Sequence, residues 1–226
     1  MSGLRSAMML PKVALVDPVL THGLPPEITA YTGMDALTQV IEPLVSNAAN
    51  VMTDMICQLG ILYGVNAIMD AFSHDDPAAR NTMALVSLWG GMALANAKLG
   101  AVHGFAGVLG GMYDAPHGAL CAALLPHVTE INVRALQMRE PNGVGLRRYT
   151  SVTQYLTGYK QNEPKEAARI LHGLVRSMNI PPLRVYGIQR ADFPAIVEKS
   201  AGSSSMRGNP IMLTGEELIE ILERAL

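Results

Sequence analysis

The stretch GAVHGFAGVLGGMYDAPHGALCAALLPHV, residues 100–128, places two histidines in a run of glycines, alanines and leucines. Gly110, Gly111 and Pro116 interrupt this run, so His103 and His117 are expected on two different elements. Apolar segments rich in Ala and Gly are typical of closely packed, buried helices. An imidazole buried there needs a partner, because a polar group taken out of water without one costs on the order of a few kcal/mol.

The remaining chain has the pattern of successive helices with recognisable starts. Pro25-Pro26, Asp75-Asp76-Pro77 and Asn162-Glu163-Pro164 are each expected to open a helix. Thr214 to Glu217 forms a capping box before the terminal run EELIEILERAL. The apolar segment 83–97 is expected to be a helix buried on most sides. In front of these helices, VALVDP (13–18) is a short β-prone run with no obvious strand partner. The sequence therefore predicts an all-α helical bundle with a short N-terminal strand.

Composition indicates a globular chain. Of its 226 residues, 49% are hydrophobic and 16% are charged, which is enough apolar material for a large core. The 17 Lys and Arg against 19 Asp and Glu give a net charge of −2, so neither nucleic acid nor an anionic membrane is expected as a partner. Cys57 and Cys121 fit buried thiols in a reducing compartment, which favours the cytoplasm. No signal peptide is recognised, and the longest apolar stretch, 83–97, is shorter than the roughly 20 residues of a membrane helix.

The segment TGMDALTQVIEP is the second place that indicates chemistry. Asp35 and Gln39 are four residues apart, so in a helix they project from the same face, and both carry oxygen atoms. The apolar residues around them predict a largely buried helix. A buried carboxylate requires a cation, a metal or strong hydrogen-bond donors.

One carboxylate and two imidazoles, from Asp35, His103 and His117, are a ligand set that holds a divalent transition ion with positions left open for water or substrate. Spacing alone leaves other interpretations open. Each histidine could be a hydrogen-bonded core residue or a helix cap, and Asp35 could pair with a lysine or arginine. The other histidines are expected to be structural or capping (His127) or solvent-exposed (His22, His74 and His172).

Several motifs occur in an order that resembles the iron-containing alcohol dehydrogenases, a family with the dehydroquinate-synthase-like fold. They are VALVDP…LT…LP, TGMDALT, S..AN..TD, LGAVHGFA and PHG…LLPHV, and the resemblance covers essentially the whole chain. In that family these segments form the C-terminal helical domain, which carries the metal and half of the substrate cleft. The resemblance implies a junction remnant of strand and linker over residues 1–18 and a helical metal and substrate domain over residues 19–226. A nucleotide-binding α/β domain precedes this region in the family and is not expected here.

The resemblance assigns the family's metal-binding aspartate to Asp35 and two of its histidines to His103 and His117. A third histidine position is occupied by Gln39, whose amide oxygen is a weaker ligand than imidazole. A further family histidine, close to the expected nicotinamide and substrate, is replaced by Gly107, which opens space in the cleft. The implied cofactors are a divalent metal, iron or zinc with nickel also possible, and NAD(P) when a nucleotide-binding domain is present.

The resemblance implies reversible hydride transfer between NAD(P) and a small alcohol or aldehyde, carried out by Asp35, His103 and His117 through their metal. The chain alone is expected to be inactive, because it has no G-x-G-x-x-G motif after a strand. An unpaired strand and exposed apolar surface favour a homodimer or a higher oligomer. Two alternatives stay open: a non-catalytic helical interaction or oligomerisation module with a lapsed metal site, and a metal-dependent hydrolase or lyase.

Overall fold

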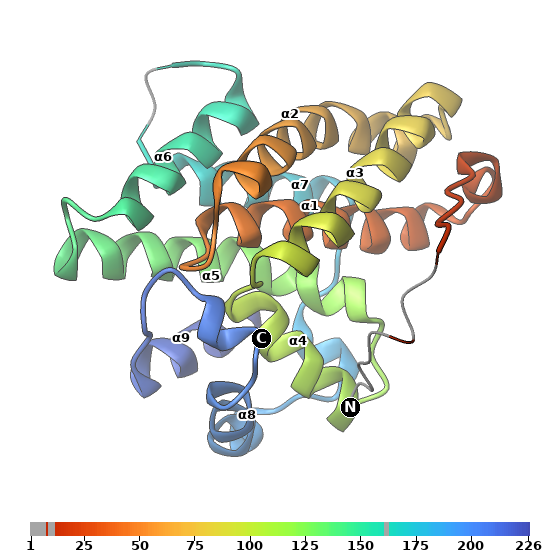
Figure 1. Cartoon of the computed structure of the whole chain (residues 1–226). Helices are drawn as coiled ribbons and strands as arrows, with labels where there is room; N and C mark the ends of the chain where they lie inside the picture. Colours follow the sequence, from red (N-terminus) through yellow and green to blue (C-terminus); the bar gives the residue numbers. More distant parts are fainter. Residues whose placement is uncertain (1–7, 9–11, 161–162) are drawn as a thin grey trace.

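The computed structural model describes residue 8, residues 12–160 and residues 163–226, and helices account for most of these residues (Figure 1). The helices of the described residues are, in chain order, η2 (Pro18–Thr21), α1 (Pro26–Val45), α2 (Val51–His74), α3 (Pro77–Asn96), α4 (Ala101–Met112), α5 (His117–Arg139), α6 (Val144–Thr157), α7 (Glu166–Ser177), η3 (Leu183–Tyr186), η4 (Arg190–Asp192), α8 (Phe193–Ala201), η5 (Met206–Gly208) and α9 (Gly215–Ala225). The all-α bundle that the sequence predicts is confirmed.

Helix α1 lies at the centre of the bundle, with α2, α3, α5 and α6 packed against it (Figure 1). Its apolar residues recur at helical spacing, and Met34, Leu37 and Val40 are completely buried. Helix α5 is the second core helix, because α4, α7 and α9 also pack on it. The candidate residues of α1, α4 and α5 are therefore carried by the most constrained part of the fold.

Three of the helix starts follow the sequence signals. Helix α1 begins at Pro26, and the Asp76 carboxylate caps α3 by accepting a hydrogen bond from the backbone N–H of Ala79 at 2.7 Å. Thr214 and Glu217 form the reciprocal capping box of α9. The signal around Pro164 was wrong in position: α7 begins two residues later, at Glu166, and Glu163 and Pro164 lie in the preceding turn, while Asn162 lies outside the described residues.

The N-terminal strand does not form. Residues 13–17 have no regular secondary structure, and Val13 and Leu15 are 80% and 90% exposed. A β-prone run acquires a strand conformation by pairing its backbone groups with another strand, and the described residues provide none. Without a partner strand, the β propensity of these residues does not give the segment a regular structure.

The expectation that segment 83–97 is buried on most sides is wrong, as the surroundings of helix α3 show. Val86, Gly90 and Ala93 are buried against α1 and α2, but Leu85 and Met92 are 40% and 45% exposed. One apolar face of α3 is therefore open to solvent.

Helix α2, rather than segment 83–97, is the longest apolar helix. Among the described residues it is the one helix that on its own is long and apolar enough to cross a membrane, judged by length and composition. It packs against α1, α3 and α6 in the bundle, where Cys57, Ile61 and Ile68 are completely buried, whereas Met52 and Met55 are exposed.

Candidate metal site between helices α1, α4 and α5

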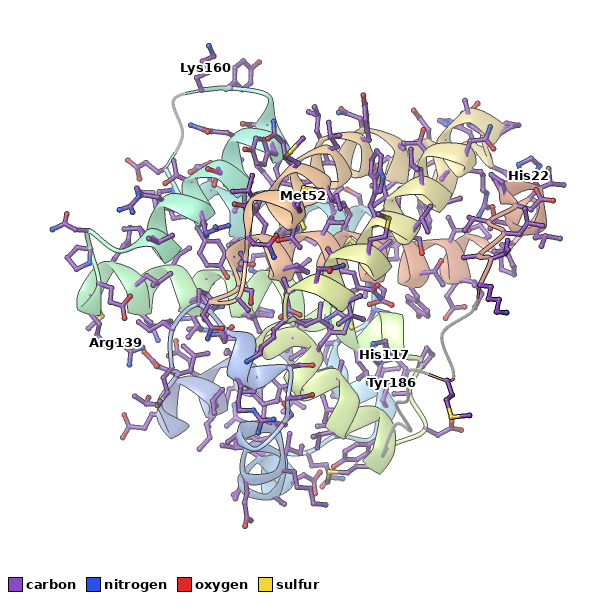
Figure 2. The ribbon with its side chains drawn as sticks, viewed as in Figure 1. His22, Met52, His117, Arg139, Lys160 and Tyr186 are labelled. Atoms are coloured by element: carbon purple, nitrogen blue, oxygen red, sulfur yellow. The ribbon has the colours of Figure 1, made fainter. Side chains whose placement is uncertain are left out.

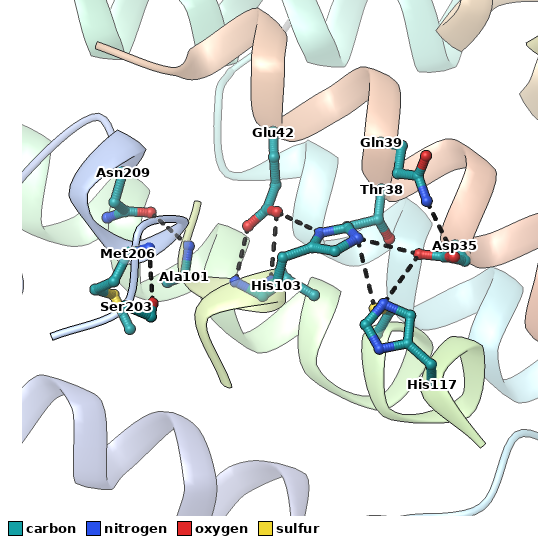
Figure 3. A network of polar contacts seen from close by, with 12 residues as sticks. Asp35, Thr38, Gln39, Glu42, Ala101, His103, His117, Ser203, Met206 and Asn209 are labelled. Carbon is teal, nitrogen blue, oxygen red and sulfur yellow. Dashed lines mark hydrogen bonds and ion pairs between the residues drawn. The ribbon is translucent and has the colours of Figure 1, made fainter. Parts of the chain in front are cut away.

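The structure brings together the three residues that the sequence singles out as metal ligands. His103 Nε2, from the first turn of α4, lies 3.2 Å from Asp35 Oδ1, in the middle of α1. His117 Nε2, from the first residue of α5, lies 3.9 Å from the same oxygen. The two imidazole rings are 5.4 Å apart between centroids. Two histidines from separate elements thus converge on one carboxylate oxygen (Figure 3).

The hydrogen bonding and the neighbours of Asp35 Oδ1 indicate whether a cation fits the site. Asp35 Oδ1 is buried and receives no hydrogen bond of good geometry, although buried acceptors are almost always paired. Its near neighbours are imidazole nitrogens, which, like carboxylates, bind divalent transition ions. The donor set therefore fits a divalent ion, which would satisfy the orphaned oxygen.

Glu42 holds His103 in position from the opposite side of its ring. The Glu42 side chain, 5% exposed, accepts a hydrogen bond from His103 Nδ1 at 2.7 Å (Figure 3). It also accepts one from the backbone N–H of Val102 at 2.7 Å, so it caps α4, whose N-cap residue Gly100 has no side chain to do so. The carboxylate fixes the ring so that Nε2 faces Asp35, an arrangement typical of a metal-binding histidine.

Close packing between α1 and α5 positions His117. A Cβ on Gly118 would lie 2.4 Å from the backbone oxygen of Tyr31 on α1, so only glycine allows the first turn of α5 to approach this closely. The side chain of His117 is 47% exposed, in contrast to that of His103 at 7%. The site is thus closed on the His103 side and open on the His117 side.

The electrostatics of the cluster depend on a few close contacts. Burial by itself raises the pKa of the Asp35 carboxyl, but contact with His103 and the nearby His117 outweigh burial and lower it. Burial lowers the pKa of His103, yet its neighbours Cys121, Asp35 and Glu42 raise it well above its usual range. Burial also lowers the pKa of His117. These contacts therefore favour the charged forms of Asp35 and His103, whose side chains lie 3.2 Å apart.

Gln39 and Gly107, the two positions at which the resemblance leads us to expect a histidine, lie near this cluster. The Gln39 amide nitrogen donates a hydrogen bond to Asp35 Oδ2 at 3.1 Å (Figure 3). Its amide oxygen faces α3, where a Cβ on Gly90 would lie 3.3 Å from it. Gly107 lies one turn after His103 on α4 and is exposed, and a Cβ there would meet nothing within 4 Å.

Two further residues of the cluster were missed by sequence reasoning. Cys121 was interpreted only as a buried thiol, but its Sγ lies 3.5 Å from His117 Nε2 and 3.9 Å from His103 Nε2. Glu42 was not singled out. Helical spacing contained both signals, since Cys121 follows His117 by four residues and Glu42 follows Asp35 by seven, which places each on the same helix face as its partner.

The remaining histidines divide into two groups. His22 and His74 are exposed as expected, and Figure 2 places His22 at the edge of the molecule, away from His117. His127 is not a cap, because it lies inside α5, and His172 on α7 is partly buried against it with ring centroids 4.7 Å apart. Helix packing overrides the exposure that the local sequence favours.

A second titratable cluster results from this contact. The donor atoms of His127, Glu130 and His172 lie within 4.8 Å of one another, and His127 Nδ1 has no hydrogen-bond partner. Burial lowers the pKa of His127 to about 4. Glu130 already binds the Arg224 guanidinium at 2.8 Å, whose positive charge opposes a second cation here.

Comparison with known proteins agrees with this geometry. Residues 29–226 match the sequence profile described as "Fe-containing alcohol dehydrogenase family, C-terminal". The chain belongs to the iron-containing alcohol dehydrogenase family. It is 37% identical over 217 residues to "Alcohol dehydrogenase 4" of Saccharomyces cerevisiae, covering 95% of this chain and 55% of the relative. It is 33% identical over 219 residues to the lactaldehyde reductase of Escherichia coli, covering 96% and 56%.

Solved structures of this family share the fold. The alcohol dehydrogenase from Oenococcus oeni superposes with a TM-score of 0.82 at 32% identity, over 93% of this chain and 54% of the other. A 1,3-propanediol oxidoreductase gives a TM-score of 0.81 at 33% identity, over 93% and 55%. The chain therefore spans about half the length of these family members and corresponds to their helical, C-terminal part.

Proposed function

We propose that residues 19–226 form the metal-holding, substrate-side domain of an enzyme that interconverts small alcohols and aldehydes by hydride transfer with NAD(P), with residues 1–18 at the junction to a nucleotide-binding domain. The observation that carries this proposal is the convergence of two imidazoles on the orphaned Asp35 Oδ1. The printed names of relatives support the substrate class, because they include a lactaldehyde reductase and a 1,3-propanediol dehydrogenase.

Asp35, His103 and His117 would hold the ion. A divalent ion bound there, iron or zinc with nickel also possible, would supply Lewis acidity toward the oxygen of an alcohol or aldehyde. Asp35 would contribute negative charge from the middle of α1, between the completely buried residues Met34 and Leu37. Glu42 keeps the His103 ring oriented toward Asp35, and the buried wall around His103 excludes water from that side.

The substrate would approach from the side of His117 and Gly107. His117 is half-exposed and Gly107 leaves open space one turn from His103, so the two residues define the accessible side of the site. With no side chain at Gly107, the cleft accommodates a bulkier substrate or one that brings its own polar group. Gly107 would also lie close to the nicotinamide.

The other parts of the proposal concern the whole enzyme. NAD(P) would bind to a nucleotide-binding domain, and the present chain would not turn it over alone. The exposed apolar residues Leu15 and Leu20, 90% and 80% exposed, favour association into a homodimer or a higher oligomer. The two buried free thiols favour a reducing compartment, the cytoplasm.

The test combines metal content with alcohol binding. The purified chain is loaded with Fe²⁺, Zn²⁺ or Co²⁺ and analysed for metal per chain, beside Asp35→Ala and the matched variant Asp70→Ala on exposed α2. Proton relaxation of 1,3-propanediol is then measured with the Co²⁺-loaded chain. We expect one ion per chain and enhanced relaxation, both lost in Asp35→Ala and both retained in Asp70→Ala.

Other outcomes would favour the alternatives. A chain that binds no ion would support a helical interaction module, and metal-dependent cleavage of esters or phosphate esters would support a hydrolase or lyase. Ordinary NAD(P)-dependent alcohol oxidation by the purified 226-residue chain would contradict the statement that it is inactive alone.

A further inference from the structure

The buried thiol of Cys121 faces the same space as the three proposed ligands. Its side chain lies one turn after His117 on α5 and is completely buried. The donor atoms of Asp35, His103, His117 and Cys121 all lie within 4.8 Å of one another. The neighbours of its sulfur are the two imidazole nitrogens, at 3.5 Å and 3.9 Å.

These separations can be compared with the edges of a tetrahedral zinc site. Zinc binds imidazole and carboxylate at about 2.0 Å and thiolate at about 2.3 Å, so ligand atoms lie about 3.3 Å apart for an N and O pair and about 3.5 Å apart for an N and S pair. The structure has 3.2 Å and 3.9 Å from Asp35 to the histidines, and 3.9 Å and 3.5 Å from Cys121 to them. Four of the six edges are thus within about 0.6 Å of the tetrahedral values. The remaining two pairs, His103 with His117 and Asp35 with Cys121, lie within 4.8 Å and would close further around an ion.

We propose that Cys121 is the fourth protein ligand of this site, in the place that Gln39 would otherwise take, and that the resulting set selects zinc over iron. This inference rests on the metal site of the proposed function. The Gln39 amide is engaged elsewhere, because its nitrogen binds Asp35 Oδ2 and its oxygen faces Gly90 on α3. A thiolate is a soft ligand that favours zinc, whereas an amide oxygen is hard.

The chemistry of ligation is a proton exchange without redox change. The Cys121 S–H bond breaks, its proton passes to solvent, and the sulfur lone pair forms the bond to the ion. Four protein ligands make a closed tetrahedral site. An alcohol oxygen could then bind only as a fifth ligand, and the exposed side of His117 is where such a position is accessible.

Cobalt substitution tests the assignment, because a thiolate ligand gives Co²⁺ a near-ultraviolet charge-transfer band that nitrogen and oxygen ligands do not. The purified chain is titrated with Co²⁺ beside Cys121→Ser, Cys121→Ala and Cys57→Ser. Cys57 is the matched control, a second completely buried free thiol, located on α2. We expect the band in the wild-type chain and in Cys57→Ser and its loss in both Cys121 variants. We also expect Zn²⁺ affinity to fall at least about tenfold in the Cys121 variants.

The outcomes separate this inference from the metal site itself. Stoichiometric Co²⁺ binding, seen in the visible ligand-field bands, without a charge-transfer band in the wild-type chain would overturn the role of Cys121 and leave the site intact. A full band in Cys121→Ser or Cys121→Ala would overturn it as well. Failure of the wild-type chain to bind Co²⁺ would overturn the metal site of the proposed function. If Cys121→Ser does not fold, the wild-type, Cys57→Ser and Cys121→Ala spectra decide the question.

Discussion

Glu42 is expected to stabilise the start of helix α4 and to orient His103 for metal binding. Glutamine keeps the size of the side chain but removes its charge, so Glu42→Gln tests these two roles separately from packing. The carboxylate accepts two hydrogen bonds of 2.7 Å, from Val102 N and His103 Nδ1. Glutamine has nearly the same shape, but its NH₂ group would face one of these donors. Because a hydrogen bond to a charged group contributes about 1.5–3 kcal/mol, we expect Glu42→Gln to lower the free energy of unfolding by about 2 kcal/mol. Glu42→Ala leaves the donors buried and unpaired and should cost about 3–5 kcal/mol.

The same substitution should weaken metal binding. Residues that orient a metal-binding histidine typically contribute a factor of about 10–100 in affinity, and we expect a loss in that range for Zn²⁺ with Glu42→Gln. Urea unfolding followed by circular dichroism measures the first effect, and competition with a chromophoric chelator measures the second. Glu223→Gln, at an exposed position of α9, is the control and should change the unfolding free energy by less than about 0.5 kcal/mol. Wild-type stability and wild-type Zn²⁺ affinity in Glu42→Gln would contradict both roles of the Glu42 carboxylate.

Two further predictions concern packing and pH. Gly118→Ala places a Cβ against the backbone of Tyr31 and should lower the free energy of unfolding by about 1–3 kcal/mol. In Gly107→Ala the new Cβ meets open space, and the free energy of unfolding should rise by about 0.5–1 kcal/mol. Equal effects of the two substitutions in urea unfolding would contradict this. His127 has a folded pKa of about 4 against 6.5 for an ordinary histidine, so the unfolded chain takes up a proton that the folded chain does not. Stability should therefore fall as pH drops, by about 1 kcal/mol between pH 7 and pH 5 after allowance for partial exposure. His127→Gln should flatten this profile, and an unchanged slope in that variant would contradict the assignment.

The helices could be predicted largely from local signals. Pro26, Asp76 and Thr214 start helices because fixed φ angles and side-chain caps act within a few residues. Where the outcome depends on distant partners, prediction failed. The run 13–16 needed a second strand, and the exposure of Leu85 depends on how many neighbours α3 acquires. Residue propensities and hydropathy do not show whether a partner strand exists or how many neighbours α3 has.

The candidate site could be predicted in part for the same reason. Asp35, His103 and His117 are suggested by their residue types and by resemblance, and the fold brings them together. Cys121 and Glu42 were missed, because a thiol in an apolar helix and a glutamate before a proline are both common without a special role. Their role depends on α1, α4 and α5 meeting at one point, and only the assembled bundle shows this.

A crystal structure of the chain grown with Zn²⁺, with anomalous difference maps recorded on both sides of the zinc absorption edge, shows directly whether these three side chains hold one ion. We expect one strong peak per chain, within bonding distance of Asp35 Oδ1, His103 Nε2 and His117 Nε2. No peak among these atoms, or a strong peak at His127 and His172 in its place, would contradict it.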